Sequence, residues 1–268
     1  PNTVLYLYYG NTGETAASNF DNTFTKNSDF SGLVAQWHID EGSGSSIDDS
    51  SSNSNDGTIT GASWVGADGG RWYTSTTAGF STGDSLSFDG TDDYVIVADK
   101  ASLDVTAITI ALWFKVDRID ISQHFVSKWG TGANDLSYAL LLNGNKVRFN
   151  TSFNGSVEDN LNSTGSVSSG VWYHIAATFN GSTKKIYFNG SEDVSFDITG
   201  NLNTTSTAAL TIGRVNTTLS SYADGIIDEV SIYGRALSAD EVKALSQRRK
   251  DSPDVGDSPT VGSEEIVP

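Results

Sequence analysis

The sequence predicts an all-β protein, an antiparallel β-sandwich with one short helix near its C-terminal end. Three observations support this fold class. Short runs of alternating apolar residues recur along the chain, Asn-Gly and Asp-Gly pairs punctuate them, and only the segment that begins at Ser238 reads as a helix. Repeated short strands with turn signals and a single helix are typical of two packed sheets.

The length and composition favour one main domain. A chain of 268 residues with 37% hydrophobic residues can bury one sizeable core, and sandwich folds reach this length as single domains. The sequence contains no cysteine, which excludes disulfides, zinc-thiolate sites and thiol catalysis.

The charge excludes several classes of partner. The formal net charge is −17, and the only basic cluster is the short run at residues 248–250. Nucleic acids and anionic membranes need clustered Lys and Arg, so neither is an expected partner. No apolar run reaches the length of a membrane-spanning helix, and no membrane insertion is expected.

The expected strands can be followed along the chain. Residues 108–116 place five apolar side chains on one face at period two, which indicates a core strand. Asp89-Gly90, Asn143-Gly144 and Asn189-Gly190 mark hairpins, because these pairs form tight turns. Further strands are expected at residues 86–88, 94–96, 124–129, 138–142 and 146–153.

A strand followed by a helix is expected near the C-terminal end. Ile226, Val230 and Ile232 fall on one strand face at period two, and Asp228 falls on the same face. A carboxylate in an apolar row is costly unless it is paired or coordinated, so Asp228 requires a partner.

The helix that follows has a recognisable start. Ser238 and Glu241 have the spacing of a capping box, while Leu237 and Val242 are placed to form a hydrophobic staple.

Five segments resemble, in order, motifs of the laminin-G-like modules, which have the concanavalin A-like jelly-roll fold. They are residues 32–44 (GLVAQWHIDEGSG), 48–58 (DDSSSNSNDGT), 86–97 (LSFDGTDDYVIV), 171–190 (VWYHIAATFNGSTKKIYFNG) and 225–241 (GIIDEVSIYGRALSADE). The resemblance implies one concanavalin A-like β-sandwich over residues 32–246.

The two ends are expected to lie outside this sandwich. Residues 1–31 read as an N-terminal β segment and linker, and Thr3 to Asn11 resembles the last strand of a small β domain of unknown function often found upstream of such modules. Residues 247–268 form an acidic, proline-containing tail, which we interpret as a linker.

A calcium site is expected beside the first and last strands of the sandwich. The segment from residue 40 to residue 56 holds five carboxylates and no Lys or Arg, and calcium prefers oxygen ligands. The resemblance implies a calcium held by acids of these strands, here Asp40 or Glu41 together with Asp228. The candidate metal ligands are Asp40, Glu41, Asp48, Asp49, Asp56 and Asp228. An EF-hand is rejected, because Thr60 stands where its Glu is required.

Catalytic chemistry is not expected. Sandwich glucanases carry an E-x-D-x-E triplet on one strand, and this sequence has none. Asp228 and Glu229 are adjacent and should point to opposite faces of a strand. We interpret His38, His124 and His174 as structural residues.

Aromatic side chains are the candidate ligand-binding residues, because sugar rings stack on exposed aromatic planes. Trp64, Trp72 and Tyr73 lie in the Gly-, Ser- and Thr-rich segment 60–84, and Trp129 and Tyr222 lie beside loops. A packing role for Trp64 and Trp72 remains open. Trp37, Trp113 and Trp172 lie in strand patterns and are expected in the core.

Together these features predict a non-catalytic, calcium-stabilised carbohydrate-binding module, similar to lectins, of a larger extracellular or cell-surface protein. The alternative is a structural or adhesive module that assembles with surface proteins, with copies of itself or with neighbouring modules. A polysaccharide lyase or glycoside hydrolase is the least favoured function.

Overall fold

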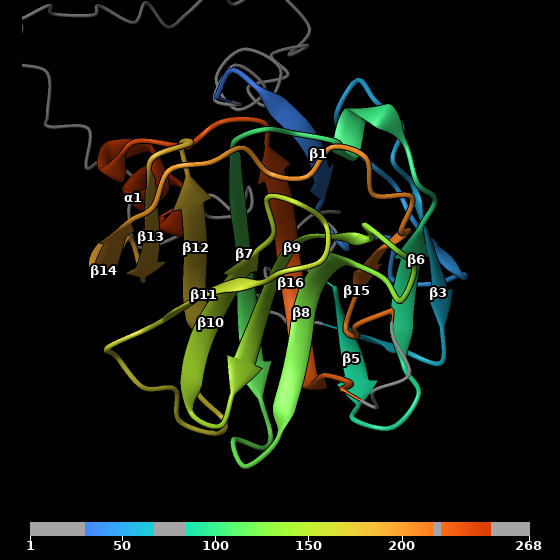
Figure 1. Cartoon of the computed structure of the whole chain (residues 1–268). Helices are drawn as coiled ribbons and strands as arrows, with labels where there is room; N and C mark the ends of the chain where they lie inside the picture. Colours follow the sequence, from blue (N-terminus) through green and yellow to red (C-terminus); the bar gives the residue numbers. More distant parts are fainter. Residues whose placement is uncertain (1–29, 67–83, 217–220, 248–268) are drawn as a thin grey trace, which may run out of the picture. The chain divides into compact units, whose positions relative to one another are not determined.

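The computed structural model describes residues 30–66, 84–216 and 221–247 (Figure 1). In these ranges sixteen β-strands form two antiparallel sheets. The same ranges contain one short 3-10 helix, η3 (Ala101–Leu103), and one α-helix, α1 (Ala239–Gln247). The predicted all-β sandwich with one short C-terminal helix is thereby confirmed. The expected strand at Thr3 to Asn11 and the acidic tail from residue 248 lie outside the described residues.

Sheet A contains eight strands in the order β14-β13-β12-β7-β16-β5-β4, and β1 also pairs with β16. Its strands are β1 (Leu33–Trp37), β4 (Ser63–Val65), β5 (Ser85–Asp89), β7 (Ile108–Val116), β12 (Tyr173–Phe179), β13 (Thr183–Phe188), β14 (Ser191–Asp197) and β16 (Asp224–Tyr233).

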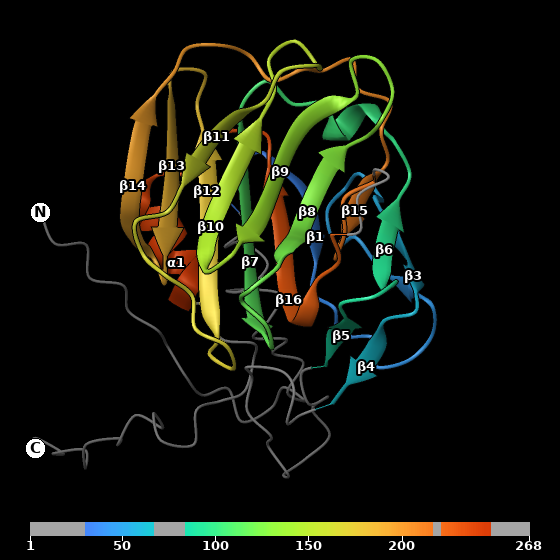
Figure 2. The same cartoon turned by 60° about the horizontal axis from the view of Figure 1, so that its bottom comes forward.

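Sheet B also contains eight strands, in the order β11-β10-β9-β8-β15-β6-β3-β2, most of which can be followed side by side in Figure 2. Its strands are β2 (Ser46–Ile47), β3 (Gly57–Thr60), β6 (Tyr94–Val97), β8 (Ser122–Trp129), β9 (Leu136–Asn143), β10 (Lys146–Thr151), β11 (Asp159–Asn162) and β15 (Leu210–Ile212).

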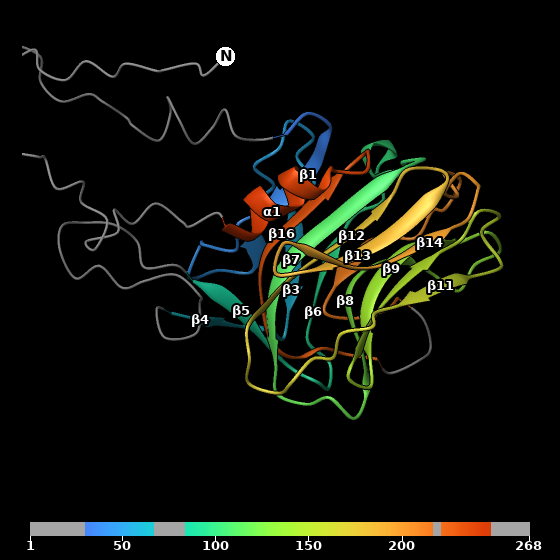
Figure 3. The same cartoon turned by 90° about the vertical axis from the view of Figure 1, so that its left-hand side faces the viewer.

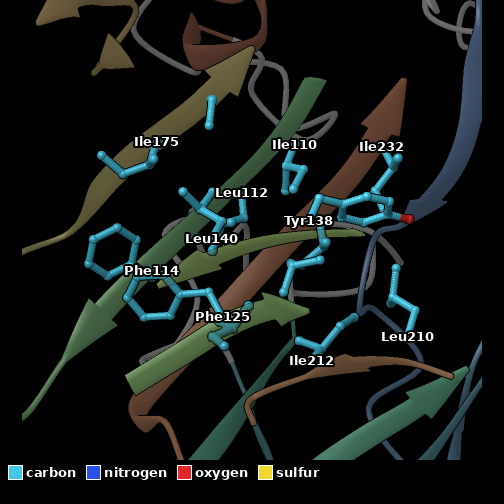
Figure 4. Packing of buried hydrophobic residues seen from close by; sticks show 14 of the residues in the cluster. Ile110, Leu112, Phe114, Phe125, Tyr138, Leu140, Ile175, Leu210, Ile212 and Ile232 are labelled. Atoms are coloured by element: carbon cyan, nitrogen blue, oxygen red, sulfur yellow. The ribbon is translucent and has the colours of Figure 1, made fainter. Parts of the chain in front are cut away.

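The core lies between the two sheets. Alternate residues of β7, including Ile110, Leu112 and Phe114, face side chains of sheet B such as Phe125 and Leu140 (Figure 4). The rings of Phe114 and Phe125 stack with their centroids 4.4 Å apart, which joins the sheets directly. The period-two pattern of residues 108–116 therefore predicted the core face of β7.

Local turn and cap signals also take the expected form. Asn189 and Gly190 form the two-residue loop of the β13–β14 hairpin, and both have positive φ (47° and 81°), as a type I′ turn requires. Ser238 Oγ accepts the N–H of Glu241, and the Glu241 carboxylate accepts the N–H of Ser238, so the predicted capping box is present. The helix α1 lies on the outer side of sheet A, away from sheet B (Figure 3).

The strand β16 has an unusual set of neighbours. One of its edges pairs with β7, whereas the other edge is shared by β5, opposite residues 224–227, and β1, opposite residues 230–233. Asp228 and Glu229 lie between these two paired stretches. The start of β5 and the end of β1 therefore meet at this point of β16, which we call the junction.

Candidate functional site

A β-bulge at the junction turns Asp228 away from the core. The register of β16 on β7 shifts between Asp228, opposite Trp113, and Ser231, opposite Ala111. Ile227, Val230 and Ile232 contribute to the core, whereas Asp228 lies with Trp113 on the outer face of sheet A. Asp228 shares its face with Ile226, as expected, but the expectation that Val230 and Ile232 lie on that face is wrong, because the extra residue in the bulge after Asp228 changes the alternation.

The backbone at the junction is strained in β16 and in the segment just after β1. Glu229 has φ 50° in the bulge, and Ile39, just after β1, has φ 59°. A β-branched residue in the left-handed region is a genuine outlier, and such strain persists where the surrounding structure enforces it. Glu229 is hydrogen-bonded through Oε2 to Nδ1 of His38, the residue before Ile39, at 2.9 Å. Strain at two converging chain segments favours a functional role for the junction.

Asp228 is buried without sufficient hydrogen-bond donors. Its side chain is 1% exposed, Oδ1 accepts the N–H of Glu229 at 2.9 Å, and Oδ2 has no partner among the described residues. Burial first of all, and then the charges of Glu229 and Asp84, raise the pKa of Asp228 well above its ordinary value. A proton or a cation would compensate this group, and the expected partner of Asp228 stays a prediction.

The strand β5 brings two further polar groups to the junction. Leu86 pairs with Ile227, so the next position along each strand places Ser85 opposite Asp228, off the core face. Ser85 is 0% exposed, and its Oγ has no partner in the described part of the chain. Asp84 precedes it, and burial raises the pKa of its carboxyl group.

Asp84 also contacts the segment that follows β1. A Cβ placed on Gly42 would lie 2.4 Å from Asp84 Oδ2, and Gly42 has φ 63°, so only glycine fits there. Asp84 and Ser85 were not among the residues predicted from the sequence, because their proximity to Asp228 depends on the pairing of β5 with β16.

The other predicted metal ligands have different surroundings. Asp49 accepts four hydrogen bonds in the loop after β1, Asp56 accepts the N–H of Asp49, and Glu41 accepts the N–H of Asp48. The Asp48 side chain is exposed, and Asp40 is half-buried, directly after the strained Ile39. Three of the six candidates thus organise the backbone of the acidic segment.

One group of three acids meets within the described ranges. Ligand oxygens of Asp89, Asp92 and Asp93, in the turn between β5 and β6, lie within 4.8 Å of one another. Asp89 Oδ1 accepts the N–H groups of Thr91 and Asp92, and Asp93 Oδ2 accepts the N–H of Asp89. These bonds hold a tight turn, and they explain the group without an ion. The predicted Asp-Gly hairpin is wrong, because β5 lies in sheet A and β6 in sheet B, so the turn connects the two sheets.

The predicted ligand-binding aromatics are dispersed over the molecule. Trp64 is half-buried against the core, and its indole N–H donates to Gly44 O at 3.0 Å. Trp129 is 7% exposed and packs with Leu141 and Val215, and Tyr222 is half-buried beside Arg214. Trp72 and Tyr73 lie outside the described residues.

The remaining tryptophans differ from one another. Trp37 lies in the core as expected, whereas Trp113 is buried on the outer face of sheet A. Trp172 is half-exposed, with Lys115 Nζ 5.5 Å from its ring centroid, so its predicted core position is wrong. Trp172 directly precedes β12. Because Tyr173 pairs with Phe114, Trp172 lies opposite Lys115, which is not a core residue.

Two of the three histidines, His124 and His174, are buried. The ring of His174 meets the ring of Trp113 edge to face at 5.0 Å, and His174 is buried. His124 Nδ1 and Ser127 Oγ are 2.7 Å apart, and burial, followed by the charge of Arg148, lowers the pKa of His124 to about 4. A buried, neutral histidine of this kind contributes to packing.

Several solved structures have a similar fold. Among solved structures, the binding domain of Paraclostridial Mosquitocidal Protein 1 has a TM-score of 0.63 and 18% identity; the match covers 80% of this chain and 52% of that one. The receptor-binding domain of botulinum neurotoxin type G has a TM-score of 0.58 and 16% identity, with 81% and 51% covered. The chain therefore spans about half the length of these two binding domains.

A third structure is of similar size. Domain 4 of AbnA, an extracellular GH43 arabinanase from Geobacillus stearothermophilus solved in complex with arabinotriose, has a TM-score of 0.56 and 22% identity. This match covers 80% of this chain and 98% of that domain. At such identities the similarities show the fold alone. No curated protein sequence matches the chain.

The helix content gives no sign of a membrane span. Within the described ranges, no helix is long and apolar enough to cross a bilayer.

The sequence comparison identifies the family. Residues 89–243, more than half of the chain, match the family described as the concanavalin A-like lectin/glucanases superfamily. The laminin-G-like resemblance of the five motifs, the two antiparallel sheets and this match agree: the chain belongs to the concanavalin A-like lectin/glucanase superfamily.

Proposed function

We propose that this chain is a non-catalytic carbohydrate-binding module of a larger extracellular or cell-surface protein, and that calcium stabilises its sandwich. Membership of the lectin/glucanase superfamily carries the proposal. The complex of domain 4 of AbnA with arabinotriose supports it, because a domain of the same fold and size holds an oligosaccharide there.

The surroundings of Asp228 argue against a glycosidase. A retaining glycosidase needs two carboxyl groups that flank an accessible glycosidic bond, about 5 Å apart. Asp228 is 1% exposed, and the carboxylate of its neighbour Glu229 is hydrogen-bonded to His38. A sugar chain has no access to this pair of acids, so the junction is better suited to a small cation.

Calcium fits the donor set of the junction. The ion prefers six to eight oxygen ligands in flexible geometry, and the junction offers the partnerless Oδ2 of Asp228 close to other carboxylates. Asp228 would hold the ion together with Glu229 and with oxygens of Asp40 and Glu41 in the segment after β1. The bound charge would relieve the repulsion among the carboxylates and join β1 to β16.

Oligosaccharide binding tests the main proposal. We expect saturable binding of arabinotriose or of another neutral oligosaccharide on a glycan array, followed by titration calorimetry with calcium and with excess chelator. An array without any saturable ligand in either condition would overturn the carbohydrate assignment, and release of reducing ends from a bound glycan would overturn the non-catalytic one.

Two tryptophan variants separate a binding role from a packing role. Trp64→Ala should lower the thermal midpoint, because Trp64 packs on the core and bonds Gly44. Trp72→Ala should weaken glycan binding with an unchanged midpoint. If Trp72→Ala instead lowers the midpoint and leaves affinity unchanged, Trp72 is a packing residue.

The alternative function is that of a structural or adhesive module, and one observation favours it. Phe196 is 51% exposed on β14, which is the terminal strand of sheet A. An exposed aromatic side chain on an edge strand suits contact with another protein surface. Light scattering would then show concentration-dependent association that Phe196→Ser abolishes; a monomer at high concentration would remove this support.

A further inference from the structure

The partnerless oxygens at the junction come from two strands. Among the described residues, Asp228 Oδ2 on β16 and Ser85 Oγ on β5 are both buried, both lack a hydrogen-bond partner, and both lie off the core face at opposing positions. Leaving one polar atom buried and unpaired is unfavourable, and two such atoms side by side point to a shared ligand that satisfies both.

Asp84 adds a charge to the same place. Asp84 directly precedes Ser85, so it lies just before β5, beside the position opposite Asp228. Asp84 Oδ2 lies against Gly42, so the chain after β1 reaches Asp84 as well as β16. Oxygen-bearing side chains at the start of β5 and in β16 therefore lie at the junction, and the segment after β1 packs against one of them, Asp84.

We infer that Asp84 and Ser85 are further ligands of the calcium ion, so that the ion joins β5 to β16 and to the segment after β1. This inference rests on the proposed calcium site and extends it beyond the acids of the first and last strands. A carboxylate and a hydroxyl are hard oxygen ligands that suit calcium.

Metal titration of matched variants tests the inference. Terbium is a suitable probe besides calcium itself, since it takes similar oxygen ligands and Trp113, opposite Asp228, can sensitise its luminescence. The variants are Asp84→Asn, Ser85→Ala and Asp228→Asn, and the matched control is Asp89→Asn, an exposed acid at the other end of β5.

The expected order of affinities is specific. Asp228→Asn should abolish binding of calcium and terbium, and Asp84→Asn should raise the Kd about tenfold, since each removes a charged ligand. Ser85→Ala should raise the Kd roughly threefold, because a neutral ligand contributes less, and Asp89→Asn should stay within about twofold of wild type.

The readouts separate ligand roles from folding roles. In excess chelator, the thermal midpoint of Asp84→Asn should equal or exceed that of wild type, because the substitution removes repulsion with Asp228. A lower midpoint in chelator, with unchanged metal affinity, would show that Asp84 is structural and overturn the inference.

Two failures remain distinguishable. If Asp228→Asn loses binding while Asp84→Asn and Ser85→Ala bind like the control, the inference is overturned and the proposed calcium site stands. If wild type binds neither calcium nor terbium, the calcium site fails and the inference fails with it.

Discussion

Two buried aspartates of this molecule, Asp49 and Asp228, have opposite hydrogen-bond surroundings. Asp49 is 9% exposed, and its two oxygens accept four hydrogen bonds, from the N–H groups of Gln36, Ser51 and Asn55 and from the hydroxyl of Ser51. Asp228 is 1% exposed and accepts only the N–H of Glu229. Both were candidate metal ligands by sequence.

The difference shows how a buried carboxylate reveals its role. Hydrogen-bond donors that saturate both oxygens stabilise the charge and leave no position for a cation. A carboxylate with a partnerless oxygen beside other acids is unstable alone and gains from a cation. Asp49 therefore organises the acidic loop, whereas Asp228 is the better candidate ligand.

The largest expected effect is a loss of stability when Asp49 is replaced. Asp49→Ala would leave the buried N–H groups of Gln36 and Asn55 unpaired and should lower the free energy of unfolding by about 3 kcal/mol. Denaturant unfolding measures this loss, which should be the same with calcium and with chelator.

The adjacent residue provides the control. Asp48→Ala changes an exposed side chain and should alter stability by no more than about 0.5 kcal/mol. If Asp49→Ala loses no stability in chelator, Asp49 acts through a bound metal. The contrast drawn between Asp49 and Asp228 would then be wrong.

The next effect concerns Asp228 and calcium. Wild type should gain about 2.7 kcal/mol at a calcium concentration about one hundred times Kd, whereas Asp228→Asn should gain nothing. In chelator, the variant should lie within about 1 kcal/mol of wild type, since the amide brings no charge into the buried position. Thermal unfolding of wild type and of Asp228→Asn, each in calcium and in chelator, measures these stabilities. Indifference of wild type to calcium would mean that a protein group or a proton compensates Asp228.

The smallest expected effect is a pH dependence of stability that comes from one of two buried lysines, Lys128 and Lys184. Lys128 contacts the carboxylates of Asp99 and Asp104, whereas Lys184 Nζ donates to Asp159 O at 2.7 Å and lies within 6 Å of the ring centroids of Phe149 and Phe153, at 5.8 and 5.9 Å. Burial lowers the pKa of Lys184 to about 8.

The direction of the pH dependence follows from that pKa. From about pH 8 to about pH 10 the unfolded chain keeps a proton on Lys184 that the folded chain has lost, so stability should rise with pH in this window. Relative to Lys184→Met, wild type should gain about 2 kcal/mol between about pH 7.5 and about pH 10. If the free energy of unfolding of wild type and of Lys184→Met changes equally with pH, the lowered pKa of Lys184 is contradicted.

Local signals in the sequence predicted much of the fold. The alternation over residues 108–116, the Asn189-Gly190 turn and the Ser238–Glu241 capping box all depend on residues close in the chain, and all are present. The five motifs likewise predicted the sandwich. These features could be recognised because turn geometry and side-chain alternation are set by neighbouring residues.

The candidate site could be predicted only in part. Asp228 was selected because a carboxylate in a strand requires a partner, and in the structure it is buried with one oxygen that has none. The face on which it lies was wrong, because one extra residue at Glu229 reverses the alternation and an amino-acid pattern does not show which residue is extra.

The sequence by itself determined the strands, the turns, the cap and the superfamily, since each depends on short-range geometry or on a motif. Only the tertiary structure decided what surrounds the acids: it saturated Asp49 with donors, brought Ser85 opposite Asp228 and placed Asp84 against Gly42. The physical reason is that these contacts join segments far apart in the chain, through strand pairings whose register depends on the packing of the whole sandwich.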